Sequence, residues 1–220
     1  MKIPYFCSYI TAALLEALGH ELQDISLFTE ETCGLEYSCA LHDNLCSYAK
    51  YLYRKILAEE KGFELAVVPN SCDAMKKLHT ALARAGRMPA FLLDIPRRSG
   101  EEAAAYLATQ YASLLGAIAP DIAPGELLRR LRDRGPARIF PPAETRGDDA
   151  ALPLRIGIAG SSYAPAFFRT TLARYAAGAV FLRHCGYGRV PAPPAEAAAS
   201  LAEQLFRMAE ATLQHTLCPR

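Results

Sequence analysis

The feature that most constrains the fold of this 220-residue chain is an alternation of short apolar runs with amphipathic segments. Residues 63–69 and 90–95 are apolar runs of strand length, and each is followed by a segment with helical periodicity. The two helices are expected over about 73–86 and 101–118. Strand–turn–helix alternation predicts a parallel sheet with crossover helices, which is an α/β fold.

A proline-rich stretch divides the chain in two. Residues 135–153 hold four prolines and two glycines, which indicates a linker. A second strand–helix–strand unit is expected after it, with strands at 154–159 and 179–183 around a helix near 165–177, and a final helix over 195–213. The sequence therefore predicts a first α/β lobe over 1–134, a linker over 135–153 and a partial second α/β lobe over 154–220. The second lobe is too short for a complete doubly wound sheet, so we expect it to be truncated.

Composition excludes several classes of protein. Apolar residues make up 51% and charged residues 21% of the chain, which is typical of a globular protein. A formal net charge of +1 gives no field that would attract nucleic acid. No uncharged run approaches the ~20 residues that span a bilayer, so no membrane association is expected. Seven cysteines, an odd number without regular spacing, do not predict a disulfide framework. A cytoplasmic location is expected, where thiols stay reduced.

Three of the cysteines lie at predicted turns. Cys46 opens an amphipathic helix whose N-cap is expected at Asp43 or Asn44, and Cys72 and Cys185 each follow an apolar run. In open α/β sheets, ligands bind beyond the carboxyl ends of the strands. Three thiolates placed there would leave one coordination position of a metal cluster open for chemistry.

Other interpretations of these residues stay open at this point. The spacing of the cysteines matches no zinc finger or ferredoxin pattern, and cysteine is often only a small buried residue. Cys33, Cys39 and Cys46 could belong to a zinc site, although no Cys-x-x-Cys pair supports one. Asp94 and Arg97 end a predicted strand at the same edge, where they would contact either a substrate or each other.

Five short segments carry a resemblance to a known family. They are Tyr5-Phe-Cys-Ser-Tyr9, Cys46-Ser-Tyr-Ala49, Asn70-Ser-Cys-Asp-Ala-Met75, Leu93-Asp-Ile-Pro-Arg97 and Cys185-x-x-x-Arg189. In this order the chain resembles the 2-hydroxyacyl-CoA dehydratase family, which includes benzoyl-CoA reductase subunits and double-cubane cluster proteins.

The resemblance implies two Rossmann-like lobes with a [4Fe-4S] cluster between them, held by Cys46, Cys72 and Cys185. It also places Ser8 near the substrate. In dehydratases of this family, an ATP-dependent activator protein supplies one electron, the unique iron binds the thioester carbonyl, a ketyl radical forms and the 2-hydroxyl leaves. The expected partners are an acyl-CoA substrate, the activator, and a second subunit in a homodimer or heterodimer.

Three functions follow as hypotheses. The first is an iron–sulfur subunit that dehydrates or reduces an acyl-CoA thioester. The second is a double-cubane reductase of small molecules, in which two cubanes are shared across a dimer. The third is a non-enzymatic module that binds a metal or a partner, because the shortened second lobe would remove part of the substrate wall.

Overall fold

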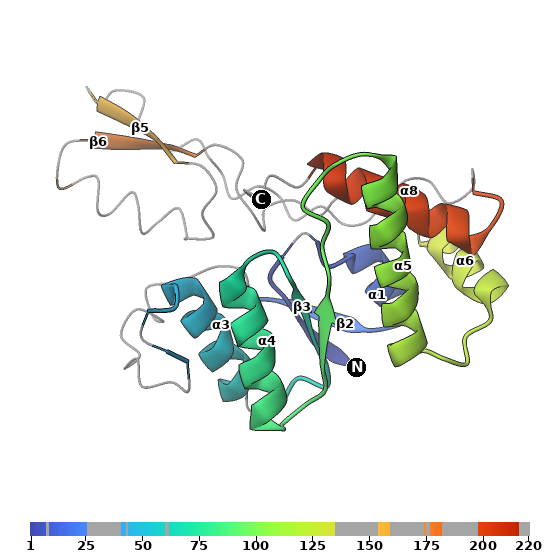
Figure 1. Ribbon diagram of the computed structural model, residues 1–220, viewed down its shortest axis with the longest axis horizontal. Helices are drawn as coiled ribbons and strands as arrows, with labels where there is room; N and C mark the ends of the chain where they lie inside the picture. The colour runs from blue at the N-terminus through green and yellow to red at the C-terminus, as the bar shows by residue number, and fades with distance from the viewer. Residues whose placement is uncertain are drawn as a thin grey trace.

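A computed structural model describes residues 1–7, 9–25, 41–42, 44–59, 62–134, 154–158, 174, 177–181 and 198–215 (Figure 1). Its elements alternate between strand and helix through most of the first half of the chain. In chain order they are β1 (Lys2–Tyr5), α1 (Ala12–Ala17), β2 (Glu21–Asp24), α3 (Ser47–Ala58), β3 (Ala66–Pro69), α4 (Asp73–Ala85), β4 (Ala90–Leu93), α5 (Glu101–Ile118), α6 (Pro124–Asp133), β5 (Leu154–Ile158), β6 (Ala177–Phe181) and α8 (Leu201–His215).

The strands of the first half run parallel. β1 pairs with β2 from Lys2↔Glu21 to Tyr5↔Asp24, and β3 pairs with β4 over four residues in the same manner. The Glu64 backbone N–H, just before β3, donates to the Lys2 carbonyl at 2.9 Å, and β1 contacts β3. The hydrogen-bonded pairs are β1–β2 and β3–β4, and β1 lies beside β3. This arrangement confirms the α/β class.

Helices cover the strands on both sides. Figure 1 shows α3 and α4 on one side and α1, α5, α6 and α8 on the other. α4 packs on β3 and β4 through the apolar stripe of Met75, Leu78 and Leu82, which repeats at helical spacing. It ends as predicted at Gly86, whose φ of +64° is a left-handed conformation that glycine adopts without strain.

The last helix, α8, packs against α5 and α6. A buried contact joins it to the rest of the core: the Tyr111 hydroxyl on α5 lies 3.2 Å from Thr212 Oγ1 on α8 and 3.3 Å from the Tyr9 carbonyl oxygen. Burial raises the pKa of Tyr111 above its ordinary value, so the phenol remains a neutral donor. The sequence groups this helix with residues 154–220, whereas its contacts are with helices of the first half; the predicted division into lobes stays a prediction.

A third parallel pair follows the linker. β5 and β6 pair from Leu154↔Ala177 to Ile158↔Phe181, close to the strands expected at 154–159 and 179–183. The helix expected near 165–177 lies almost wholly outside the described residues. Within the described ranges, no helix has both the length and the apolar character needed to cross a membrane.

Candidate metal centre

Cys46 and Cys72 occupy the same structural position in two neighbouring helices. Cys46 is the N-cap of α3 and Cys72 is the N-cap of α4, and neither side chain makes a capping hydrogen bond. The first turn of a helix has backbone N–H groups without intrahelical acceptors, and it carries a partial positive charge. Both features favour a negatively charged group beside the first turn of a helix.

The N-cap expected for α3 was wrong. Asn44 lies two residues before the cap, and its backbone N–H donates to His42 Nδ1 at 3.1 Å, while Asp43 lies outside the described residues. The helix begins at Ser47, immediately after Cys46. A polar residue was expected at the cap because its side chain usually satisfies a first-turn N–H, and Cys46 does not do so.

The two cysteines lie at the same edge of the sheet. α3 connects β2 to β3 and α4 connects β3 to β4, so each helix runs back from the carboxyl end of one parallel strand to the amino end of the next. Their N-termini therefore meet at the carboxyl edge, and α3 and α4 pack against each other (Figure 1). Cys46 and Cys72 are both exposed and free of disulfides. This is the edge where open α/β sheets bind ligands.

The turn that carries Cys72 is fixed to the neighbouring strand β4. The Asn70 backbone N–H donates to the Leu93 carbonyl at 2.8 Å, and the Asn70 side-chain amide donates to Asp94 Oδ1 at 2.6 Å. The Tyr106 hydroxyl on α5 donates to Asp94 Oδ2 at 2.6 Å. Asp94 therefore anchors the Asn70–Cys72 turn between β4 and α5, a role that sequence reasoning missed when it paired this carboxyl with a substrate or with Arg97.

The environment of Asp94 favours its charged form. The pKa of Asp94 lies below its usual range, chiefly because the Tyr106 hydroxyl donates to the carboxylate. The hydrogen bond from Asn70 lowers this pKa further. Burial raises the pKa of Asp94, and the positive charge of Lys76 lowers it. Each of these contacts is made to the ionised carboxylate, so Asp94 links protonation to the stability of the Cys72 turn.

This link predicts a pH-dependent effect of Asp94→Asn. Because the pKa of Asp94 is lower in the folded chain than the ordinary 3.8, its stabilising contribution is present above pH 3.8 and is lost as the pH falls through the folded value. Urea unfolding from about pH 6 down to about pH 3 should show Asp94→Asn less stable than the unmodified chain at the upper end, with the difference shrinking at the lower end. Tyr106→Phe should show a smaller change of the same sign. A difference that stays constant across this range would contradict the anchor.

The remaining predicted residues of the centre lie outside the described part of the chain. Cys185 and Ser8 are both among the residues that the structure does not describe. Cys7, beside Ser8, is partly exposed just beyond β1. Within the described residues, no group of three or more His, Cys, Asp or Glu side chains could hold a metal ion. The structure thus brings Cys46 and Cys72 to one edge, and the set of three cysteines stays a prediction.

The fold and this edge define the class as an α/β protein with parallel strands and two exposed thiols at the helix N-termini. Residues 7–120 match the family model of the 2-hydroxyglutaryl-CoA dehydratase D-component. The matched segment covers just over half of the chain and contains Cys46 and Cys72, while Cys185 lies beyond it. The chain belongs to the 2-hydroxyglutaryl-CoA dehydratase D-component family, which confirms the resemblance found in the sequence. A comparison with curated proteins finds no match.

Proposed function

We propose that this chain is an iron–sulfur component of the 2-hydroxyacyl-CoA dehydratase type, with Cys46, Cys72 and Cys185 as ligands of a [4Fe-4S] cluster. Its reaction is a one-electron dehydration or reduction of an acyl-CoA thioester. The observation that carries the proposal is the placement of Cys46 and Cys72 as exposed N-caps of adjacent helices, within the segment that matches the family.

The residues present fit such a cluster. Iron–sulfur clusters are held by cysteine thiolates, and Cys46 and Cys72 supply two thiols without a disulfide or a capping bond. Their two helix N-termini offer first-turn N–H groups to the sulfur atoms. When bound, a cluster with three protein ligands supplies single electrons and one coordination position for the substrate.

The protein's own part in the reaction is to hold the cluster ligands in place and to orient the substrate. The Asp94–Asn70 hydrogen bond fixes the backbone that carries Cys72, so this ligand does not need to be ordered when the cluster binds. Ser8 comes three residues after Tyr5, the last residue of β1, in the sequence, and is proposed to contact the substrate. In this proposal an ATP-dependent activator protein delivers the electron in the cytoplasm.

The two-lobe organisation belongs to the same proposal. The first lobe is 1–134, the linker is 135–153, and 154–220 belongs to a second Rossmann-like lobe that supplies Cys185. The parallel pairing of β5 and β6 supports a second α/β unit in this region. A second subunit, in a homodimer or heterodimer, is the further partner in this proposal.

Turnover in the presence of an activator tests the function. The anaerobically reconstituted chain is mixed with a dehydratase activator, ATP and a set of 2-hydroxyacyl-CoA thioesters, and enoyl-CoA formation is followed by chromatography. We expect product only when ATP, activator and an intact Cys72 are all present. An iron-loaded chain that forms no enoyl-CoA but reduces acetylene or azide with ATP would contradict the dehydratase assignment and favour the double-cubane reductase.

A further inference from the structure

A solvent-exposed tyrosine of α5 takes part in the hydrogen-bond network behind Cys72. Tyr106 is 42% exposed, and its hydroxyl donates to Asp94 Oδ2 at 2.6 Å. Asp94 is the residue that directly follows β4. Its backbone N–H donates to Gln110 Oε1 at 3.4 Å, one turn further along α5. α5 thus holds Asp94 through two polar side chains that lie on the same face of the helix.

The network continues from Asp94 to the backbone around Cys72. The Asn70 side-chain amide donates to Asp94 Oδ1 at 2.6 Å. The Ser71 backbone N–H donates to the Pro69 carbonyl at 2.8 Å, and the Cys72 carbonyl accepts the first hydrogen bonds of α4. The backbone is therefore held before and after Cys72, while the side chain of this cysteine is exposed and makes no capping bond. Tyr106 is two hydrogen bonds away from the turn that presents this thiol.

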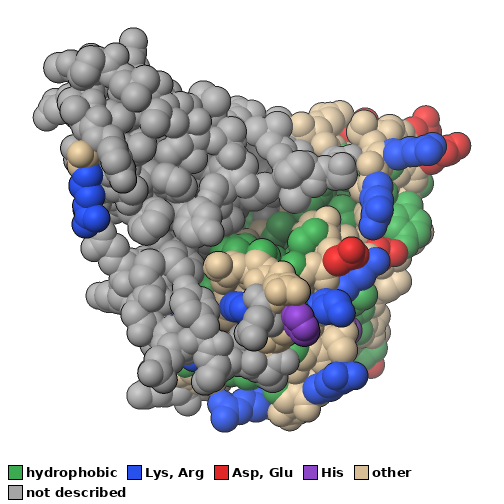
Figure 2. All heavy atoms as spheres, turned by 60° about the vertical axis from the view of Figure 1, so that its left-hand side comes forward, with side chains coloured by type: hydrophobic (Ala, Val, Ile, Leu, Met, Phe, Trp, Pro, Cys, Tyr) green, Lys and Arg blue, Asp and Glu red, His purple; other side chains and the backbone are tan. Residues whose placement is uncertain are grey.

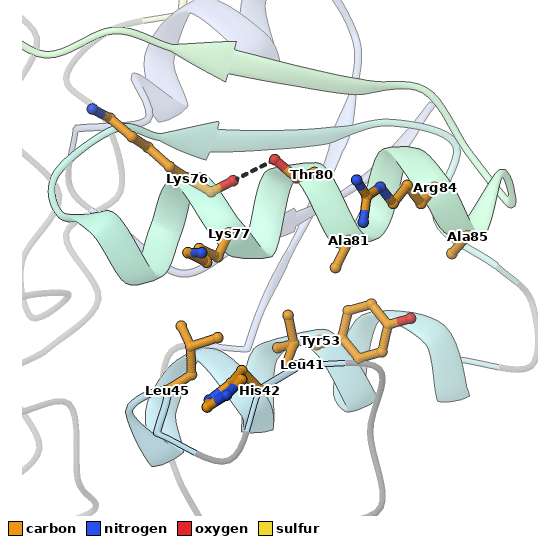
Figure 3. Close-up of a pocket in the computed structure, with 10 residues that line it drawn as sticks. All are labelled: Leu41, His42, Leu45, Tyr53, Lys76, Lys77, Thr80, Ala81, Arg84 and Ala85. Carbon is orange, nitrogen blue, oxygen red and sulfur yellow. Dashed lines mark hydrogen bonds between the residues drawn. The ribbon is translucent and has the colours of Figure 1, made fainter.

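A lysine of α4 adds a positive charge to the same network. The charge of Lys76 lowers the pKa of Asp94. Figure 3 shows the Lys76 side chain extending from α4 toward the carboxyl ends of the neighbouring strands, whereas Lys77 lies on the side of the helix that faces Leu45. Both lysines are exposed, and Figure 2 shows Lys and Arg side chains over the described part of this face. Lys76 therefore acts at the carboxyl edge of the sheet, and Lys77 acts away from it.

We propose that Tyr106 is a positioning residue for the Cys72 ligand of the proposed cluster, and that it acts through Asp94 and Asn70. The inference rests on the proposed function, because it gives Tyr106 a role toward the cluster that Cys72 would hold. Groups that hydrogen-bond behind a metal ligand fix its orientation, and removing one of them typically lowers metal affinity about 10–100-fold. The Tyr106 hydroxyl is such a group, since it fixes the carboxylate that holds the Asn70 side chain.

The network also places two opposite charges beside the Cys72 turn. Asp94 carries the negative charge and Lys76 carries the positive charge. Net charge and hydrogen bonds around an iron–sulfur cluster set its reduction potential. Because reduction adds one negative charge to the cluster, neutralising Asp94 should raise the potential and neutralising Lys76 should lower it. A loss of stability alone gives no such pair of opposite shifts.

Iron retention tests the positioning role of Tyr106. Tyr106→Phe keeps the aromatic ring and removes only the hydroxyl. Ser113→Ala is the control, because it removes an exposed hydroxyl from the same helix that bonds only to the preceding turn of α5. The anaerobically reconstituted proteins are mixed with an iron chelator, and the decay of the visible absorption is followed. We expect Tyr106→Phe to lose its iron about tenfold faster than the unmodified chain, and Ser113→Ala to lose it at the unmodified rate. Equal rates in Tyr106→Phe and the unmodified chain would overturn the proposal.

Redox titration, followed by electron paramagnetic resonance of the reduced cluster, separates positioning from a general loss of stability. We expect Asp94→Asn to raise the midpoint potential and Lys76→Gln to lower it, while Lys77→Gln, with the same charge change, has a smaller effect. Tyr106→Phe should change the resonance positions of the reduced cluster. Unchanged potentials in Asp94→Asn and Lys76→Gln, together with an unchanged spectrum of Tyr106→Phe, would overturn the proposal.

Hydrogen exchange of the metal-free chain gives a measurement that does not depend on the cluster. The backbone amides of Asn70 and Ser71 are hydrogen-bonded, so they should exchange faster in Tyr106→Phe than in Ser113→Ala. Equal exchange in the two variants would overturn the link between Tyr106 and the turn. An unmodified chain that binds no iron contradicts the proposed function itself. An iron-loaded chain whose Tyr106→Phe variant behaves like the unmodified one contradicts only this inference.

Discussion

Replacing Cys72 by alanine is expected to remove the iron from this protein. The thiolate is a direct ligand in the proposed centre, and losing a residue that merely supports a metal ligand costs about 10–100-fold in affinity, so the loss of the ligand itself should exceed this range. Anaerobically purified Cys72→Ala should be colourless, with iron and acid-labile sulfide reduced to background. Its fold should persist, because the exposed Cys72 side chain makes no capping bond to α4.

Cys7→Ala provides the matched control. Cys7 lies in the same half of the chain, is not disulfide-bonded and is not one of the three proposed ligands. This variant should retain iron, sulfide and colour at the level of the unmodified chain. Circular dichroism of all three proteins separates the loss of a ligand from unfolding. A folded Cys72→Ala that retains full iron would contradict the role of this cysteine.

Replacing Leu78 by alanine is expected to cause a large loss of stability. Leu78 lies on the buried stripe of α4 and is 0% exposed, and α4 packs on both β3 and β4. Truncating a fully buried leucine leaves a cavity and costs about 2–5 kcal/mol. A domain is stabilised by only about 5–15 kcal/mol in total, so the urea midpoint should fall by a large fraction.

Leu57→Ala is the control for this prediction. Leu57 lies on α3 and is only partly buried against the same core, so the same truncation removes less buried surface. Its effect on the free energy of unfolding should be clearly smaller. Equal losses in the two variants would show that α4 is not held to the sheet through Leu78.

The sequence predicted best the helices that follow β3 and β4. For α4 and α5 the apolar residues recur at helical spacing over three or more turns, and glycines at positions 86 and 100 mark a boundary of each. Both helices were found within one residue of the expected ends. In a long helix the apolar spacing repeats several times, so a single atypical residue does not obscure the prediction.

The strands of the amino-terminal pair had no such signal. β1 contains Pro4, and β2 has a single apolar residue in the sequence Glu-Leu-Gln-Asp. Four residues give too few alternations to identify a strand, and proline normally argues against one. The order of strands and the position of β1 beside β3 depend on long-range pairing, which no local pattern encodes.

The candidate site was likewise predicted only in part from the sequence. The turns that carry Cys46 and Cys72 could be found from the sequence because each borders a recognisable helix. The anchor of the second turn could not, because Asn70 and Asp94 are separated by 24 residues and meet only through the pairing of β3 with β4. Tyr106 lies on a third element, α5, so its hydrogen bond to Asp94 could not be predicted from the local sequence either.

Iron and acid-labile sulfide analysis of the unmodified chain, purified without oxygen, shows directly whether this protein holds the proposed cluster. We expect about four iron and four sulfide per chain, with the visible absorption of a [4Fe-4S] cluster. A folded chain without iron or sulfide, after both anaerobic purification and reconstitution with iron and sulfide, would contradict it.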